Sequence, residues 1–69
     1  MRNKFYNLKA ARAYQGLTQK DMAKLLGVDE TSYNKKENGQ VKFDIFEAKK
    51  IADYFGKSIE ALFFRSDQM

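Results

Sequence analysis

The sequence of 69 residues contains no cysteine, histidine, proline or tryptophan. Without cysteine and histidine the chain lacks the usual zinc ligands, a disulfide framework and the commonest general base. We therefore expect no enzymatic activity, no metal site, no cofactor and no evident small-molecule ligand. The apolar runs are too short for a membrane span or a secretory signal, so we expect a cytoplasmic protein without a membrane partner.

The chain is short enough to form only one domain, over residues 1–69, near the lower size limit for a single hydrophobic core. Thirteen lysines and arginines against nine acidic residues give a net charge of +4. The positive field favours acidic partners, nucleic acid among them. Charge alone does not decide this, because many small domains are mildly basic and bind nothing acidic.

Helical apolar spacing occurs in five segments, separated by four glycines where left-handed helix caps are expected. The expected inward residues are Leu8, Ala11 and Arg12 in helix 1 (Tyr6 to Gln15), Met22, Leu25 and Leu26 in helix 2 (from Thr18), Ile45, Ala48, Ile51, Ala52 and Phe55 in helix 4 (Ile45 to Phe55), and Ile59, Leu62 and Phe63 in helix 5. Every helix after the first has a capping candidate. These are Thr18 with Asp21, Asp29, Asp44 with Glu47, and Ser58.

The segment from Thr18 to Gly39 reads TQKDMAKLLGVDETSYNKKENG. Ala23 is small enough for two helices to cross closely, Gly27 suits a left-handed turn, and Val28 and Tyr33 are placed to point back into the core. The spacing indicates a helix-turn-helix whose second helix, helix 3, has its far side exposed.

The sequence resembles the family of phage repressors and Cro-type regulators through GLTQKDMAKLLGVDETSYNKKENG and IADYFGKSIEALF, over roughly Leu8 to Phe63. The resemblance implies an all-α, five-helix, lambda-repressor-like fold with the helix-turn-helix at helices 2 and 3. It also implies a transcriptional regulator, here a repressor, acting in the cytoplasm of a bacterium, on the nucleoid. In this family a homodimer places its two copies of helix 3 in the major groove of a near-palindromic double-stranded DNA operator.

Two residues depart from the family pattern. Lys36 stands where the family usually has a large apolar residue, and it is expected to loosen the end of helix 3 unless its stem packs inward with the ammonium reaching water. Phe43 replaces a common proline ahead of helix 4, which leaves the loop less rigid; the alternative is that Phe43 packs onto Ala48.

The resemblance assigns base contacts to Glu30, Thr31 and Lys35, and helical spacing places Asn34 on the same outer side. Lys35 suits guanine, Glu30 suits cytosine and Thr31 suits a thymine methyl group. The alternative is that Glu30 only complements the helix dipole and Lys35 is a solvated charge.

Four residues are predicted to contact phosphates. They are Gln19, Ser32, Asn38 and Lys42. Gln19 matches a family glutamine at the start of helix 2, where backbone amides favour an anion. The alternatives are an ordinary surface glutamine and, for Asn38 with Gly39, simply a good turn.

Two charges fall on inward faces: Arg12 lies four residues after Leu8, and Glu37 four after Tyr33. Each charge is costly alone, and the family has an arginine and a glutamate paired at these positions. We therefore expect a structural ion pair that fixes helix 3 against helix 1.

Aromatic residues gather at the chain ends. We expect Lys4 to Tyr6 and Phe63 to Arg65 to join as a short antiparallel ribbon, with Phe64 and Tyr54 in the dimer interface. The alternative is that these aromatics only close the core. The alternative function is a protein-interaction module with the same fold, such as an antitoxin or an anti-repressor partner.

Overall fold

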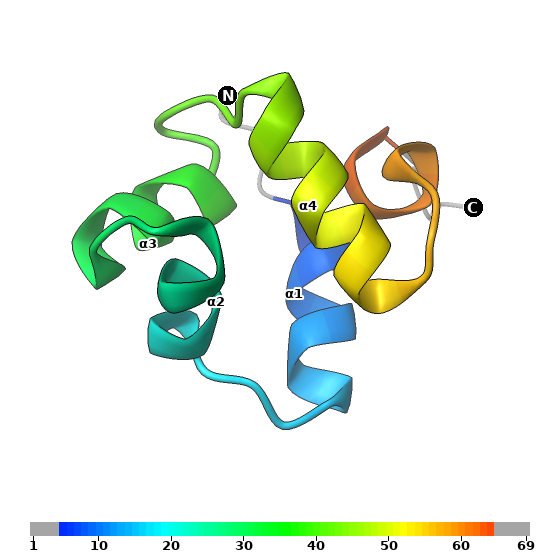
Figure 1. Ribbon diagram of the computed structural model, residues 1–69, viewed down its shortest axis with the longest axis horizontal. Coiled ribbons are helices and arrows are strands. Elements are labelled where there is room, and N and C mark those ends of the chain that lie inside the picture. Colours follow the sequence, from blue (N-terminus) through cyan, green and yellow to red (C-terminus); the bar gives the residue numbers. More distant parts are fainter. Residues whose placement is uncertain (1–4, 65–69) are drawn as a thin grey trace.

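The computed structural model describes residues 5–64, which form five helices and no strand (Figure 1). The elements are α1 (Tyr6–Tyr14), α2 (Gln19–Leu26), α3 (Glu30–Glu37), α4 (Ile45–Phe55) and η1 (Glu60–Phe64). The last is one turn of π-helix at the position expected for helix 5. The all-α fold class and the five helical segments are confirmed.

Side-chain caps explain where the later helices begin. The Thr18 hydroxyl accepts from the Asp21 amide at 3.0 Å, and the Asp44 carboxylate accepts from the Glu47 amide at 2.7 Å, each within a reciprocal capping box. Asp29 caps α3 and Ser58 caps the last turn, as expected. Phe5 gives α1 no side-chain cap, but its backbone N–H donates to the Glu37 carbonyl at 3.1 Å.

The core takes side chains from all five helices. Its buried hydrophobic members are Leu8, Met22, Ala23, Tyr33, Ile51, Ala52, Phe55, Leu62 and Phe63. The expectation that Ile45 points inward is wrong, because its side chain is 73% exposed. Ala52, seven residues later and about 20° away around the helix, is buried, so Ile45 is exposed because of its place in the first turn of α4 and not because of its helix face.

The expected ribbon at the chain ends is also wrong for the described residues. Tyr6 lies in α1, and Phe63 and Phe64 lie in η1. The neighbours Leu62 and Phe63 are both buried, whereas a strand would send adjacent side chains to opposite faces. Lys4 and Arg65, the outer members of the expected ribbon, lie outside the described residues.

The two departures from the family pattern contact each other. The Lys36 ammonium pairs with nearby acceptors: it lies 2.9 Å from Glu47 Oε1 and 3.2 Å from the Lys42 carbonyl oxygen, and the side chain is 13% exposed. It also stands 5.9 Å from the centroid of the Phe43 ring. Phe43 is half-buried and packs edge-on against the rings of Phe5, Tyr33 and Phe63 at centroid distances of 5.5, 6.1 and 5.1 Å.

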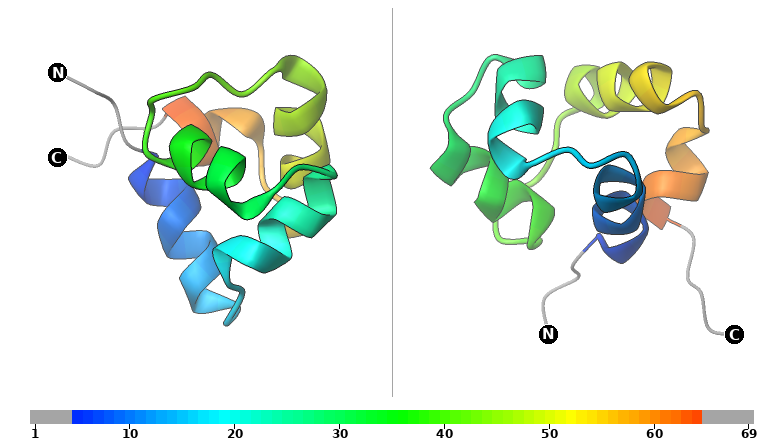
Figure 2. Two further views of the ribbon diagram at one scale, coloured as in Figure 1. Left: turned by 90° about the vertical axis from the view of Figure 1, so that its left-hand side faces the viewer. Right: turned by 90° about the horizontal axis from the view of Figure 1, so that it is seen from below.

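The helices leave one side of α3 uncovered. α2 packs against α3 on its inner side, α4 packs on α2, and α1 packs on η1 (Figures 1 and 2). In Figure 1, α3 forms the left edge of the molecule, away from η1 on the right. Within residues 5–64, none of the helices has the length and apolar character needed to span a membrane.

Candidate nucleic-acid interface

Helix α3 has one buried side and one side open to solvent. Tyr33 and Glu37 are fully buried. Glu30, Thr31 and Lys35 are exposed, while Ser32, Asn34 and Asn38 are half-buried. The structure therefore gathers the residues predicted to read bases on the accessible side of one short helix.

An ion pair links α1 to the end of α3. Arg12 Nε lies 2.8 Å from Glu37 Oε2, and Arg12 Nη2 lies 3.1 Å from Glu37 Oε1, which makes the contact bidentate. Arg12 Nη1 donates to the Leu17 carbonyl at 2.9 Å, so the guanidinium also holds the loop before α2. The predicted pair is present, with the glutamate side chain fully buried and the arginine 16% exposed.

Two further side chains donate to the same carboxylate. The Tyr33 hydroxyl donates to Oε2 at 2.8 Å, and Gln19 Nε2 donates to Oε1 at 2.9 Å. Burial favours the protonated acid, but hydrogen bonds from Arg12, Gln19 and Tyr33 outweigh it and hold the pKa of Glu37 below its ordinary value. Burial, and then the hydrogen bond to Glu37, raise the pKa of Tyr33, so its hydroxyl keeps the proton that it donates.

Gln19 connects this buried site to the outer side of α3. Its Oε1 accepts from Asn34 Nδ2 at 3.0 Å, and Asn34 Oδ1 accepts from Asn38 Nδ2 at 3.3 Å. Sequence reasoning treated these three residues as independent DNA contacts and missed their mutual bonds. The available signal was the buried Glu37, whose carboxylate needs more donors than one arginine supplies.

A shallow hollow of about 280 Å³ lies where α2 meets α3. Gln19, Glu30, Thr31 and Asn34 line it, so three predicted base readers and one predicted phosphate contact share one surface. The other predicted residues lie outside this lining. Lys35 and Lys42 are exposed, and the Ser32 backbone N–H is used by Asp29 at 2.7 Å.

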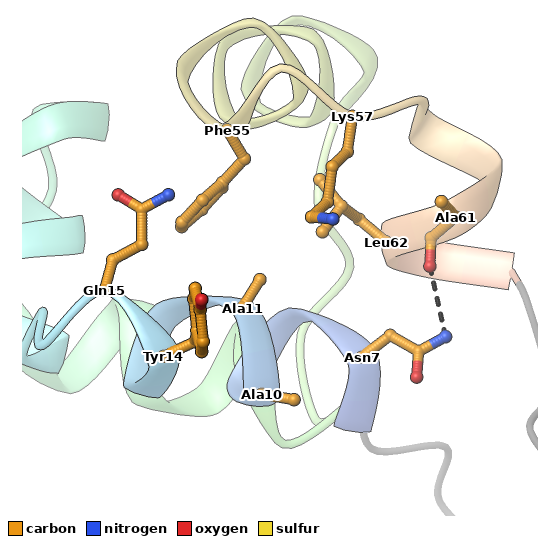
Figure 3. Close-up of a pocket in the computed structure, with 9 residues that line it drawn as sticks. All are labelled: Asn7, Ala10, Ala11, Tyr14, Gln15, Phe55, Lys57, Ala61 and Leu62. Atoms are coloured by element: carbon orange, nitrogen blue, oxygen red, sulfur yellow. Dashed lines mark hydrogen bonds between the residues drawn. The ribbon is translucent and has the colours of Figure 1, made fainter.

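Two larger concavities lie away from this surface. One, of about 720 Å³, is formed by α1, the end of α4 and η1, with Tyr14 and Lys57 at its rim (Figure 3). The other, of about 420 Å³, is mostly apolar and is lined by Ile45 and Phe64 among others. Phe64 is 74% exposed and Tyr54 50%, and Tyr54 does not line this second groove.

The fold and this surface define a helix-turn-helix domain, and comparisons with known proteins agree. The helix-turn-helix family model matches residues 8–62, so the chain belongs to that family. An uncharacterized HTH-type transcriptional regulator of Methanocaldococcus jannaschii is 42% identical over 67 residues, covering 97% of each chain.

Two solved structures are also similar. A transcriptional regulator from Listeria innocua superimposes with a TM-score of 0.82 and 27% identity; the match covers all of this chain and 65% of that one. The restriction-modification controller protein C.AhdI from Aeromonas hydrophila gives a TM-score of 0.69 and 28% identity over 83% of each chain. These neighbours confirm the lambda-repressor-like fold.

The ion pair yields a first prediction, on stability. Arg12→Ala strands a buried carboxylate and is expected to lower the free energy of unfolding by about 3–5 kcal/mol. The matched control is Lys49→Ala, which removes an exposed pair with Asp53 at 3.1 Å and should cost at most about 1 kcal/mol. Urea denaturation measures both. Equal, small losses would contradict a structural role for Arg12.

The lowered pKa of Glu37 yields a second prediction, on pH dependence. A carboxylate whose pKa is depressed by folding stabilises the protein above its unfolded pKa, about 4.3, and loses that contribution as the pH falls through the folded value. Wild type should therefore exceed Glu37→Gln in stability at pH 7, and the difference should shrink below about pH 4.3. Thermal melts from pH 7 to pH 2 test this. The pKa values of the helix caps Asp21 and Asp29 are also lowered, but both proteins contain these caps. Their contribution to stability therefore cancels when the two proteins are compared. A pH-independent difference would contradict the prediction.

Proposed function

We propose that this protein is a sequence-specific double-stranded DNA-binding regulator, a repressor, that inserts α3 into the major groove. The observation that carries the proposal is the division of α3 into a fully buried side, Tyr33 and Glu37, and an exposed polar side. Because the buried side is fixed by hydrogen bonds, the outer side chains project from a rigid support. Because this proposed role is on the DNA of the nucleoid, we also propose that the protein is cytoplasmic.

The outer side chains have the chemistry that base edges require. Lys35 donates to guanine O6 or N7, Glu30 accepts from cytosine N4, and Thr31 contacts a thymine methyl group. Asn34 offers both a donor and an acceptor. Gln19, Ser32, Asn38 and Lys42 flank these residues and supply phosphate contacts that set the position of α3 in the groove.

The second part of the proposal is that the protein binds as a homodimer. Two copies of α3 must stand about 34–36 Å apart to enter successive major grooves, which makes the operator near-palindromic. Phe64 and Tyr54 are the proposed interface residues, supported by their exposure of 74% and 50%. Ile45, 73% exposed, lines the same apolar groove as Phe64. Exposed apolar patches of this kind often mark protein interfaces.

The alternative, a protein-interaction module, draws on the same apolar groove beside Ile45 and Phe64. Salt dependence separates the two. DNA affinity should fall by about 0.9 log units per log unit of salt for each phosphate neutralised, whereas an apolar protein contact hardly responds.

The third prediction concerns base reading. Lys35→Ala should relax the preference at one base pair per half-site, at a cost of about 1–3 kcal/mol per contact. The matched control is Lys57→Ala, which removes an equal charge from the exposed loop between α4 and η1. It should leave the preference unchanged. Selection of bound fragments from random DNA, followed by titration of the selected site, measures both. An identical loss on selected and random DNA in the Lys35 variant would contradict base reading.

The fourth prediction concerns the dimer. Phe64→Asp places a charge in the proposed apolar interface, so the variant should be folded, monomeric and much weaker on a site with two half-sites. Tyr14→Asp is the matched control, because Tyr14 is 92% exposed on α1, away from the groove. Sedimentation and DNA titration give the answer. If the Phe64 variant remains a dimer with unchanged DNA affinity, the interface lies elsewhere.

A further inference from the structure

A chain of side-chain amides runs from the buried ion pair to the outer side of α3. It begins at Glu37, passes through Gln19 and Asn34, and ends at Asn38, with bonds of 2.9, 3.0 and 3.3 Å. Gln19 belongs to α2 and the other three residues to α3 or its C-terminal cap. This series of hydrogen bonds therefore connects the core to a surface predicted to meet DNA.

The chemistry of Glu37 sets the direction of every bond in this chain. An ionised carboxylate only accepts hydrogen bonds, so the Gln19 atom that faces it must be the NH₂ group. The Gln19 carbonyl is then left to face Asn34, which must present its own NH₂ group. The Asn34 carbonyl in turn faces Asn38. A side-chain amide that is free in solution can turn its carbonyl either way. Here the buried charge of Glu37 fixes the orientation of the amides of Gln19, Asn34 and Asn38 in turn.

The selected orientation leaves Asn34 with a defined set of free groups. One N–H is bonded to Gln19 and one carbonyl lone pair accepts from Asn38, so one N–H and one lone pair remain. One N–H donor and one carbonyl acceptor are the two groups that asparagine uses to read adenine, through N7 and the N6 amino group. Asn34 also lines the hollow shared with Glu30 and Thr31, where a base edge would approach.

We propose that Gln19 is a positioning residue for Asn34, and that the Glu37–Gln19–Asn34 chain fixes Asn34 in the orientation that reads an adenine. This inference rests on the proposed DNA binding and refines it. Gln19 acts on sequence preference as well as on affinity. A glutamine that served only as a phosphate contact would affect all DNA sequences equally.

The test is a double-mutant cycle on DNA with Gln19→Met, Asn34→Ala and the combined variant. Methionine keeps the length and removes the amide. Each single change should reduce the preference for the same A·T pair, by on the order of tenfold to a hundredfold, and the combined variant should lose no more than Asn34→Ala alone. Lys20→Met is the matched control on the exposed side of α2 and should retain the preference.

Three results would overturn the inference. Gln19→Met could weaken all sequences by one factor, the two changes could act additively, or Asn34→Ala could leave the A·T preference intact. If wild type selects no DNA sequence, the proposed function fails together with the inference; if it selects one and the cycle is additive, only the inference fails.

A measurement on wild type alone covers the case in which Gln19→Met does not fold. NMR relaxation of side-chain amides should give Asn34 an order parameter approaching that of a rigid backbone amide, about 0.85, before DNA is added. The exposed Gln40 should fall below about 0.6. An equally mobile Asn34 amide would overturn the proposal.

Discussion

The buried carboxylate of Glu37 is the constraint on which the arrangement of the helices depends. A charge with no exposed side-chain surface is tolerated only where donors surround it, and here they come from Arg12 on α1, Gln19 on α2 and Tyr33 on α3. Each donor must lie within hydrogen-bonding distance of the same carboxylate, so the positions of the three helices relative to one another are fixed. Within residues 5–64 no buried side-chain nitrogen or oxygen lacks a partner, which agrees with a site that is fully satisfied.

This constraint replaces the apolar stripe that α3 lacks. Its sequence, ETSYNKKE, offers Tyr33 as its only large apolar side chain, too little for a helix to be held by hydrophobic burial alone. Packing on α2 and the bonds at Glu37 hold it instead. The exposed positions of α3, Glu30, Thr31 and Lys35, take no part in the buried core, so they can carry polar side chains of the kind that a partner surface requires.

Sequence reasoning succeeded where the controlling interaction is local. The capping boxes at Thr18 and Asp44 and the helical spacing of the core residues depend on neighbours three or four positions away. The misplacement of Ile45 and the ribbon at Phe63 and Phe64 both involve packing between elements, which spacing does not encode. β-propensity favoured a strand for the aromatic ends, but the neighbours Leu62 and Phe63 are both buried where η1 packs on α1, which a strand would not allow.

In the candidate site, too, local features were predicted from the sequence and contacts between distant residues were not. Helical spacing alone put Asn34 on the outer side of α3, and the inward charges Arg12 and Glu37 predicted their ion pair. The bond between Gln19 and Asn34 joins residues fifteen positions apart on different helices. The pairing of Lys36 with Glu47 spans eleven positions across a loop. Neither follows from residue type, because each depends on how the backbone turns between the two partners.

The aromatic cluster around Phe43 gives the proposed dimer a means of setting the spacing of its two α3 helices. Phe43 contacts Tyr33, which is bonded to Glu37 on α3, and it contacts Phe63, the neighbour of Phe64 in η1. The proposed interface and the helix proposed to read DNA are thus joined through packed rings. A closely packed interior transmits a displacement where a loose linker would absorb it. A two-fold axis at Phe64 would therefore fix the distance between the two α3 helices, because the path between them runs through ring contacts and the buried Glu37 site.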